Sequence, residues 1–180
     1  VNTVILVQGD LGRPQIDVAL LLGAYGLGSM IVALGMPKLL DSLPDRRVML
    51  TGGVALPFLL LATSGTIAWL EGTSQWVTLL ALWVLLGAGT STILTPYARL
   101  LRRNCTEQNR PAVFAAQFSL SHACFLITYP FAGALGAAIG LPAVALVLVA
   151  LGILGARFAL LTWQARPHRD AAAAERRAKA

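Results

Sequence analysis

The feature that most constrains this chain is a series of long segments that carry no charge. Four segments contain no Asp, Glu, Lys or Arg: 18–37, 48–70, 72–98 and 111–156. A helix needs roughly 20 apolar residues to cross the hydrocarbon core of a bilayer. The first three segments have the length of one crossing each, and the fourth is long enough for two. Gly140 and Pro142 mark the break within it, because Gly often ends a helix and Pro often begins one.

The sequence therefore predicts an all-α polytopic membrane protein with five transmembrane helices, at about 17–37, 48–70, 75–97, 111–139 and 142–163. Only 12% of the residues are charged, whereas soluble domains have about 25%. A net charge of +6 makes nucleic acid a partner to consider. A surface that binds nucleic acid interleaves basic and aromatic residues on one face, whereas here the basic residues lie between apolar segments. We expect the lipid bilayer as a partner, and no nucleic acid.

The basic residues alternate along the chain. Of the 14 Lys and Arg residues, 13 lie in the segments 38–47, 99–110 and 157–180. Short basic loops remain in the cytoplasm during membrane insertion. This rule predicts that both loops and the C-terminus are cytoplasmic, which places residue 1 outside or within the membrane. We therefore expect residues 1–8 to be the end of a truncated helix.

The same pattern divides the chain into two parts. Residues 1–163 form the predicted transmembrane bundle, and residues 164–180 form a basic cytoplasmic tail. The tail is either a short helix on anionic lipid or a solvated segment.

The charges between the first two spans form the segment GMPKLLDSLPDRRVML, residues 35–50. This segment resembles G-x-x-x-D-R-x-G-R-R, the cytoplasmic loop signature of the major facilitator superfamily of secondary transporters. Asp41 matches the aspartate of the signature, and Arg46 and Arg47 match its closing basic pair. The segment departs from the signature at Pro37 and Ser42, lacks the second glycine, and has Asp45 in addition. Such departures are typical of the second copy of the signature, which follows the eighth helix.

This resemblance implies the C-terminal bundle of a twelve-helix transporter, from the end of the seventh helix to the twelfth. The N-terminal six-helix half would be the partner of the bundle. The resemblance also implies a cytoplasmic gating loop whose charges pair across the two halves: Asp41, Asp45, Arg46 and Arg47. The alternative is that these arginines only set the topology, as in any cytoplasmic loop.

The span 111–139 carries the most polar side chains. Gln117, Ser121, Cys124 and Thr128 recur at helical spacing and form one stripe. A second stripe beside it contains Phe118, His122, Phe125 and Tyr129. Polar groups are costly against lipid, so this face should look onto protein or a water-filled cavity, and an intramembrane His is a candidate proton carrier. The predicted substrate or proton cavity comprises Gln117, Ser121, His122, Cys124, Thr128 and Tyr129. The alternative is a neutral His122 that bonds a neighbouring helix.

Small residues predict close helix packing in several spans. In YPFAGALGAAIG, the predicted packing residues are Gly133, Gly136 and Gly140, the last two in a G-x-x-x-G arrangement. This segment resembles the Pro/Gly-rich signature of superfamily antiporters. The segments GAYGLGSM and GAGTST are expected to pack closely in the same way.

The sequence contains no nucleophile–base constellation, no metal-ligand spacing and no phosphate-binding loop. We therefore predict no catalytic residue, no metal, no cofactor and no enzyme activity. The resemblance implies alternating-access transport of a small molecule, with proton-coupled efflux, in a bacterial inner membrane. The alternatives are a non-transporting polytopic membrane subunit or scaffold and, after it, an intramembrane enzyme.

Overall fold

The computed structural model describes residues 2–162, which are almost entirely helical and contain no strand. Its elements are α1 (Asn2–Val4), the π-helix η1 (Ile5–Asp10), α2 (Gln15–Ser42), α3 (Asp45–Trp69), α4 (Gly72–Arg103), α5 (Arg110–Ile139) and α6 (Leu141–Thr162). Within the described residues, the five helices α2 to α6 are long and apolar enough to cross a membrane. The predicted all-α polytopic class with five transmembrane helices is confirmed. The predicted tail, 164–180, lies outside the described residues.

The breaks between helices lie at residues that cannot continue a regular helix. Pro44 has an extended backbone and precedes the first residue of α3. Gly72 and Gly140 have φ angles of +62° and +82°, a region that favours glycine. Gly140 thus ends α5, and α6 begins at the next residue.

Two helices extend further than hydropathy predicts. The charged segment expected as a loop at 38–47 is helical except at Leu43 and Pro44, and α4 continues to Arg103 before the connection to α5. Hydropathy reports where a helix leaves the hydrocarbon, whereas backbone hydrogen bonding continues until a residue breaks it. Pro37, Pro57, Pro96 and Pro130 lie inside helices, which spans tolerate when other groups bond the freed carbonyl oxygens.

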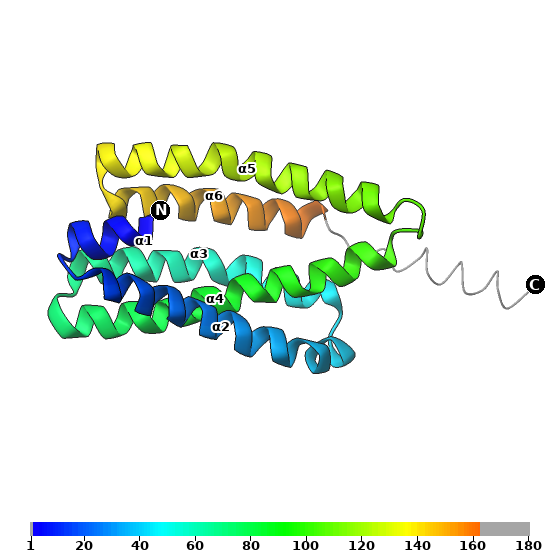
Figure 1. Cartoon of the computed structure of the whole chain (residues 1–180), viewed down its shortest axis with the longest axis horizontal. Coiled ribbons are helices and arrows are strands. Elements are labelled where there is room, and N and C mark those ends of the chain that lie inside the picture. Colours follow the sequence, from blue (N-terminus) through cyan, green and yellow to red (C-terminus); the bar gives the residue numbers. More distant parts are fainter. Residues whose placement is uncertain (1, 163–180) are drawn as a thin grey trace, which may run out of the picture.

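The helices run up and down, so that their connections gather at two ends (Figure 1). One end, here called the basic end, holds the connections at 43–44 and 104–109 and the C-terminal end of α6. The opposite end holds the connections at 11–14, 70–71 and 140. The two predicted basic loops therefore lie at the same end of the molecule.

The tightest packing in the bundle joins α2 to α4. A Cβ atom on Gly28 would overlap the backbone carbonyl of Val84, and one on Gly87 would overlap that of Tyr25. A Cβ on Gly52 would lie 2.9 Å from the carbonyl oxygen of Gly89, which joins α3 to α4 in the same way. The two glycine-rich segments of α2 and α4 thus pack closely, as predicted.

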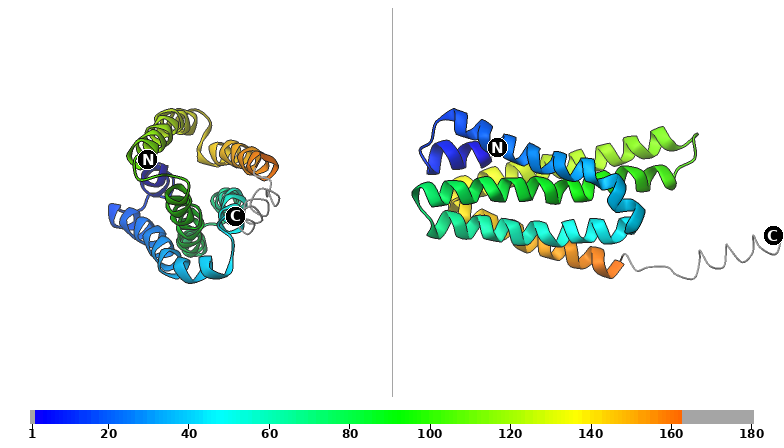
Figure 2. Two further views of the ribbon diagram at one scale, coloured as in Figure 1. Left: turned by 90° about the vertical axis from the view of Figure 1, so that its right-hand side faces the viewer. Right: turned by 90° about the horizontal axis from the view of Figure 1, so that it is seen from below.

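The helix α5 lies along one side of the bundle and meets the other helices mainly near its turn into α6 (Figure 2). Among the described residues, α5 has no buried side chain, although it is 30 residues long. The segment formed by α1 and η1 is held more firmly. Its residues Leu6 and Val7 are buried in one apolar cluster with Val18, Leu21, Leu79 and Leu141.

Candidate functional site

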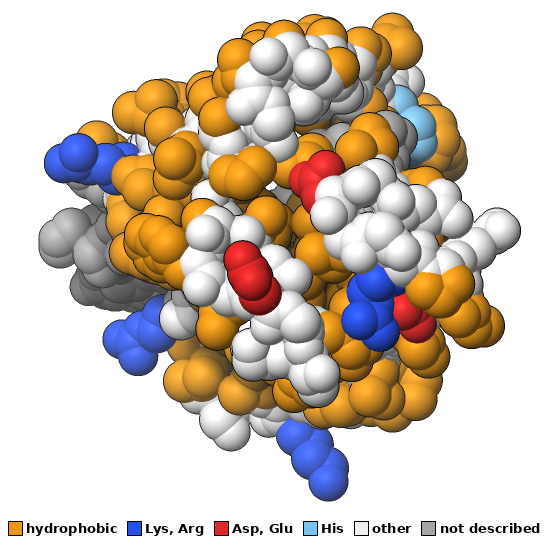
Figure 3. Space-filling view, turned by 90° about the vertical axis from the view of Figure 1, so that its left-hand side faces the viewer, with side chains coloured by type: hydrophobic (Ala, Val, Ile, Leu, Met, Phe, Trp, Pro, Cys, Tyr) orange, Lys and Arg blue, Asp and Glu red, His pale blue; other side chains and the backbone are white. Residues whose placement is uncertain are grey.

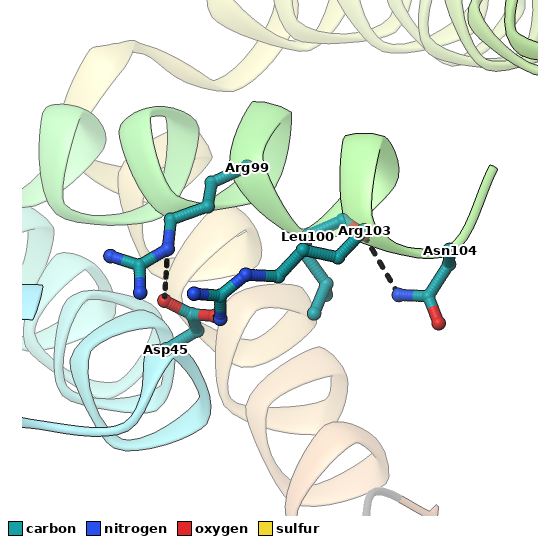
Figure 4. A network of polar contacts seen from close by, with 5 residues as sticks. All are labelled: Asp45, Arg99, Leu100, Arg103 and Asn104. Atoms are coloured by element: carbon teal, nitrogen blue, oxygen red, sulfur yellow. Dashed lines mark hydrogen bonds and ion pairs between the residues drawn. The ribbon is translucent and has the colours of Figure 1, made fainter. Parts of the chain in front are cut away.

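Charged residues at the basic end form a cluster around the first residue of α3. Asp45 accepts a hydrogen bond from Nη1 of Arg103 at 3.1 Å, and its other oxygen lies 3.8 Å from Nε of Arg99 (Figure 4). Arg99 and Arg103 are one helical turn apart in the last turns of α4, so both side chains reach the same carboxylate. The carboxylate also stands at the positive end of the α3 dipole. The side chain of Asp45 is only 11% exposed.

The end of α4 is completed by its own cap. The side chain of Asn104 donates a hydrogen bond to the carbonyl oxygen of Leu100 at 2.8 Å (Figure 4). This bond satisfies one of the last carbonyl groups of the helix, which have no partner within it. The Asp45 cluster, defined as Asp45, Arg99 and Arg103, therefore joins the start of α3 to a capped end of α4.

The four predicted gating residues are not brought together as one group. Asp45 makes the ion pairs, whereas Asp41 is exposed and makes no ion pair within residues 2–162. Arg47 is exposed, and Arg46 is partly buried. Asp45 is additional to the signature, but it is the carboxylate that pairs α3 with α4 at this end. The partners Arg99 and Arg103 were missed; their spacing of four residues at the end of a span was the available signal.

Three polar atoms near the basic end are buried without a hydrogen bond from the described residues. They are Oδ1 of Asp45, Nε of Arg46 and the hydroxyl oxygen of Tyr97. A buried polar group without a partner costs roughly 1–3 kcal/mol, so such atoms are uncommon in a folded protein. Oδ1 of Asp45 is nevertheless offset by the charge of Arg99, which lies 3.8 Å away.

The aromatic stripe predicted on α5 is continuous. The rings of Phe118 and His122 stack with centroids 3.8 Å apart, His122 meets Phe125 edge to face at 5.8 Å, and Phe125 stacks on Tyr129 at 5.3 Å. An open hollow of about 550 Å³ lies beside His122, Phe125, Tyr129 and Pro130. The stripe is thus a preformed surface on one helix.

The hydrogen bond of His122 defines which ring nitrogen is free. Nδ1 of His122 lies 2.8 Å from the carbonyl oxygen of Phe118. A carbonyl oxygen only accepts, so Nδ1 carries the proton and Nε2 of the neutral ring is left as an acceptor. The ring is exposed, so Nε2 is open to a hydrogen-bond donor from outside α5.

The polar stripe beside it is satisfied largely within α5. The hydroxyl of Ser121 donates to the carbonyl oxygen of Phe118, and that of Thr128 donates to the carbonyl oxygen of Cys124. Gln117 and Ser121 are partly buried, whereas Cys124 and Thr128 are exposed. In the described chain, no other helix closes a cavity over this stripe, so its predicted role in a cavity stays a prediction.

The predicted packing glycines of α5 have few neighbours. A Cβ on Gly133 would meet no atom within 4 Å, and one on Gly136 would meet only a side-chain atom of Leu141 at 3.5 Å. Gly140 lies in the turn, so it does not form a G-x-x-x-G helix surface with Gly136. The prediction for Gly140 is wrong in this respect, because the positive φ that ends α5 is what requires a glycine there.

A second cavity, which the sequence did not indicate, lies among α3, α4 and α6. It has a volume of about 490 Å³, and its lining includes Gly53, Pro57, Leu86, Gly152, Gly155 and Ala156. The lining has no titratable side chain. This cavity suits an apolar group and cannot bind a proton or an ion through its side chains.

The described residues contain no group of three or more His, Cys, Asp or Glu that could hold a metal ion. No curated protein and no solved structure matches the chain significantly. A family model described as Major Facilitator Superfamily matches residues 1–180. Because this match spans the whole chain, and five of the described helices are long and apolar enough to cross a membrane, the chain belongs to the major facilitator superfamily of secondary transporters.

Proposed function

We propose that the chain is the C-terminal bundle of a twelve-helix transporter that exports a small molecule in exchange for protons. Family membership supports secondary transport in general. The observation that carries the finer proposal is the uncovered face of α5, where polar and aromatic stripes lie side by side and no described residue is buried. In such transporters, the substrate binds near the bilayer midplane between two repeats, which move against each other.

The uncovered face fits this position on physical grounds. The hydroxyls of Ser121 and Thr128 bond within α5, but the amide of Gln117 gains nothing from lipid, whereas a water-filled path or a second bundle can bond it. The rings of Phe118, His122, Phe125 and Tyr129 offer a largely apolar surface that includes one imidazole and one phenol hydroxyl. We assign this face to the substrate and proton pathway, with Gln117, Ser121, His122, Cys124, Thr128 and Tyr129 as its residues.

The basic end supports an assignment to the cytoplasm and to contact with the other half. Its excess of Arg follows the rule for loops that are not translocated, so the C-terminus is cytoplasmic in a bacterial inner membrane. Asp41 and Arg47 are exposed, so they are available to bond groups of the other half when this end is closed.

The experiment uses everted membrane vesicles that contain the intact gene product and an acid-inside pH gradient, which acridine orange reports. A panel of small organic cations, weak acids and neutral amphiphiles is added one compound at a time. A transported compound should dissipate the gradient, because each molecule entering the vesicle drives protons out. Vesicles that contain residues 1–180 alone should show no dissipation, since one bundle cannot form a site between two.

The outcomes separate the parts of the proposal. Saturable uptake of a labelled compound without loss of the pH gradient would retain transport and reject proton coupling. Dissipation of equal size by residues 1–180 alone would reject the two-half site. No effect of any compound on the intact protein, by either readout, would favour a non-transporting membrane subunit.

A further inference from the structure

At the end opposite the basic loops, Arg13 contacts three helical elements. Its backbone N–H donates to the carbonyl oxygen of Val7, in η1, at 2.8 Å. Its Nε donates to Oδ2 of Asp17, in α2, at 2.6 Å. Its guanidinium carbon lies 4.1 Å from the ring centre of Trp76, in α4, which is a cation–π contact. Arg13 therefore joins η1, α2 and α4 through three different interactions.

The partner of Arg13 is an unusually shielded carboxylate. Asp17 is 7% exposed and is the only acidic residue in the described chain that is classed as buried. The next residue, Val18, belongs to the apolar cluster that also holds Leu6 and Val7. A shielded charge without a counter-charge is costly, so Asp17 stabilises this arrangement only while Arg13 remains in contact.

The connection that carries Arg13 is short and consists of residues 11–14, between η1 and α2. Gly12 has a φ of +59°, and a Cβ there would meet no atom within 4 Å. Pro14 follows Arg13 and precedes the first residue of α2. The glycine is thus needed for its backbone conformation and not for close packing, and the side chain of Arg13 provides the polar attachment of this connection to α2 and α4.

From these contacts, we propose that Arg13, Asp17 and Trp76 form a latch that fixes the segment 2–10 against α2 and α4. Figure 3 views this end, where a basic side chain lies against an acidic one among largely apolar and uncharged groups. When the ion pair opens, the segment 2–10 moves away from the bundle and exposes the apolar cluster beneath it. Arg13 and Asp17 are positioning residues in this proposal, which does not depend on the substrate, the direction of transport or the coupling ion.

The test measures how often Val7 becomes accessible. Val7 is 0% exposed, so Val7→Cys should react with a small water-soluble maleimide only when the segment 2–10 lifts. The intact protein is used in detergent, in a background where Cys105, Cys124 and any other cysteine are Ser. We expect Asp17→Asn and Arg13→Gln each to raise the labelling rate about tenfold, as expected for the loss of a hydrogen bond between charged groups.

Three further variants test whether Arg13, Asp17 and Trp76 act as a unit. The double variant Arg13→Gln/Asp17→Asn should label no faster than either single variant, because both remove the same interaction. Trp76→Leu should raise the rate about threefold, because it removes the cation–π contact and leaves the ion pair in place. Trp76→Phe keeps an aromatic face and should remain near the parent rate.

Matched controls separate a local opening from a general loosening. Asp10→Asn removes an exposed carboxylate of the same region and should leave the labelling rate unchanged. Met36→Cys reports on the separate buried cluster near the basic end, where Met36 is 0% exposed, and its rate should not respond to Asp17→Asn. If either single variant does not fold, the double variant Arg13→Gln/Asp17→Asn carries the test against the parent, since it removes the ion pair without leaving a shielded charge unpaired.

The proposal is overturned by unchanged labelling of Val7→Cys in Arg13→Gln. It is equally overturned if Asp10→Asn accelerates labelling as much as Asp17→Asn, or if Met36→Cys accelerates in parallel. None of these results bears on whether the intact protein transports, which the vesicle experiment measures separately.

Discussion

Two aspartates near helix starts, Asp17 in α2 and Asp45 in α3, are shielded from solvent and paired with arginine. Their partners tie both ends of α4 to its neighbours: Arg13 lies on Trp76 at one end, and Arg99 and Arg103 lie at the other. In a chain with few charges, these contacts are polar attachments that the apolar helix surfaces cannot supply, since lipid competes equally for apolar groups.

The Asp45 cluster should contribute to the stability of the folded protein. Asp45→Asn removes the charge that two arginines share, and we expect the free energy of unfolding in detergent to fall by about 1–2 kcal/mol, because Arg103 is partly solvated. Asp41→Asn should change it by less than about 0.5 kcal/mol, since Asp41 is exposed and unpaired within the described residues. Equal losses in the two variants, measured by thermal unfolding, would contradict this assignment.

A substitution of His122 tests whether this residue carries the coupled proton. Gln keeps a hydrogen-bond donor and an acceptor but cannot titrate, so His122→Gln should insert and fold normally. If Nε2 takes up the coupled proton, the variant should lose the pH dependence of transport in the intact protein. The measurement is the initial rate of gradient dissipation between about pH 5.5 and pH 8. A pH profile identical to that of the parent would make His122 a structural residue.

Which helices pack closely depends on where glycine leaves a helix surface without a side chain. Gly28 and Gly87 let the backbones of α2 and α4 touch, and such close approach is a main source of association between helices in lipid. By contrast, α5 has glycines with few neighbours, so the same residue type has different consequences in different helices.

A pair of variants in α2 tests this contact. Gly28→Ala places a methyl group onto the carbonyl of Val84, and we expect the helices to shift at a cost of about 1–3 kcal/mol. Gly23→Ala is the matched control, because a Cβ there meets no atom within 4 Å. It should be neutral or stabilise α2 by up to about 1 kcal/mol, since Ala is the better helix former. Thermal unfolding in detergent distinguishes the signs, and a stabilising Gly28→Ala would contradict the packing described.

The helix bounds and contacts show how much of the fold could be predicted from the sequence. Apolar length predicted five helices, because a span must be apolar throughout. It missed the helical residues 38–42 and 99–103, which carry charge but contain no residue that breaks a helix. It also could not predict that Asp45 would meet Arg99 and Arg103 more than fifty residues away, because hydropathy contains no information on which helices are neighbours. The stripes of α5 were predictable because they follow from the spacing within one helix.

At the scale of the whole molecule, the connections divide between two ends, and one end carries most of the basic residues outside the tail. The proposed assignment of the basic end to the cytoplasm also determines which side of the membrane the Arg13 latch faces. This orientation follows from charge alone, so it needs a test that does not use charge.

Cys105 offers the most direct measurement, because it lies in the connection between α4 and α5 at the basic end and is partly buried but not enclosed. The intact protein with Cys124→Ser is treated with a membrane-impermeant maleimide, in whole cells with the outer membrane made permeable and in everted vesicles. We predict that Cys105 is labelled in everted vesicles and protected in cells. Ready labelling in cells, with protection in everted vesicles, would contradict the cytoplasmic position of the basic end and the topology built on it.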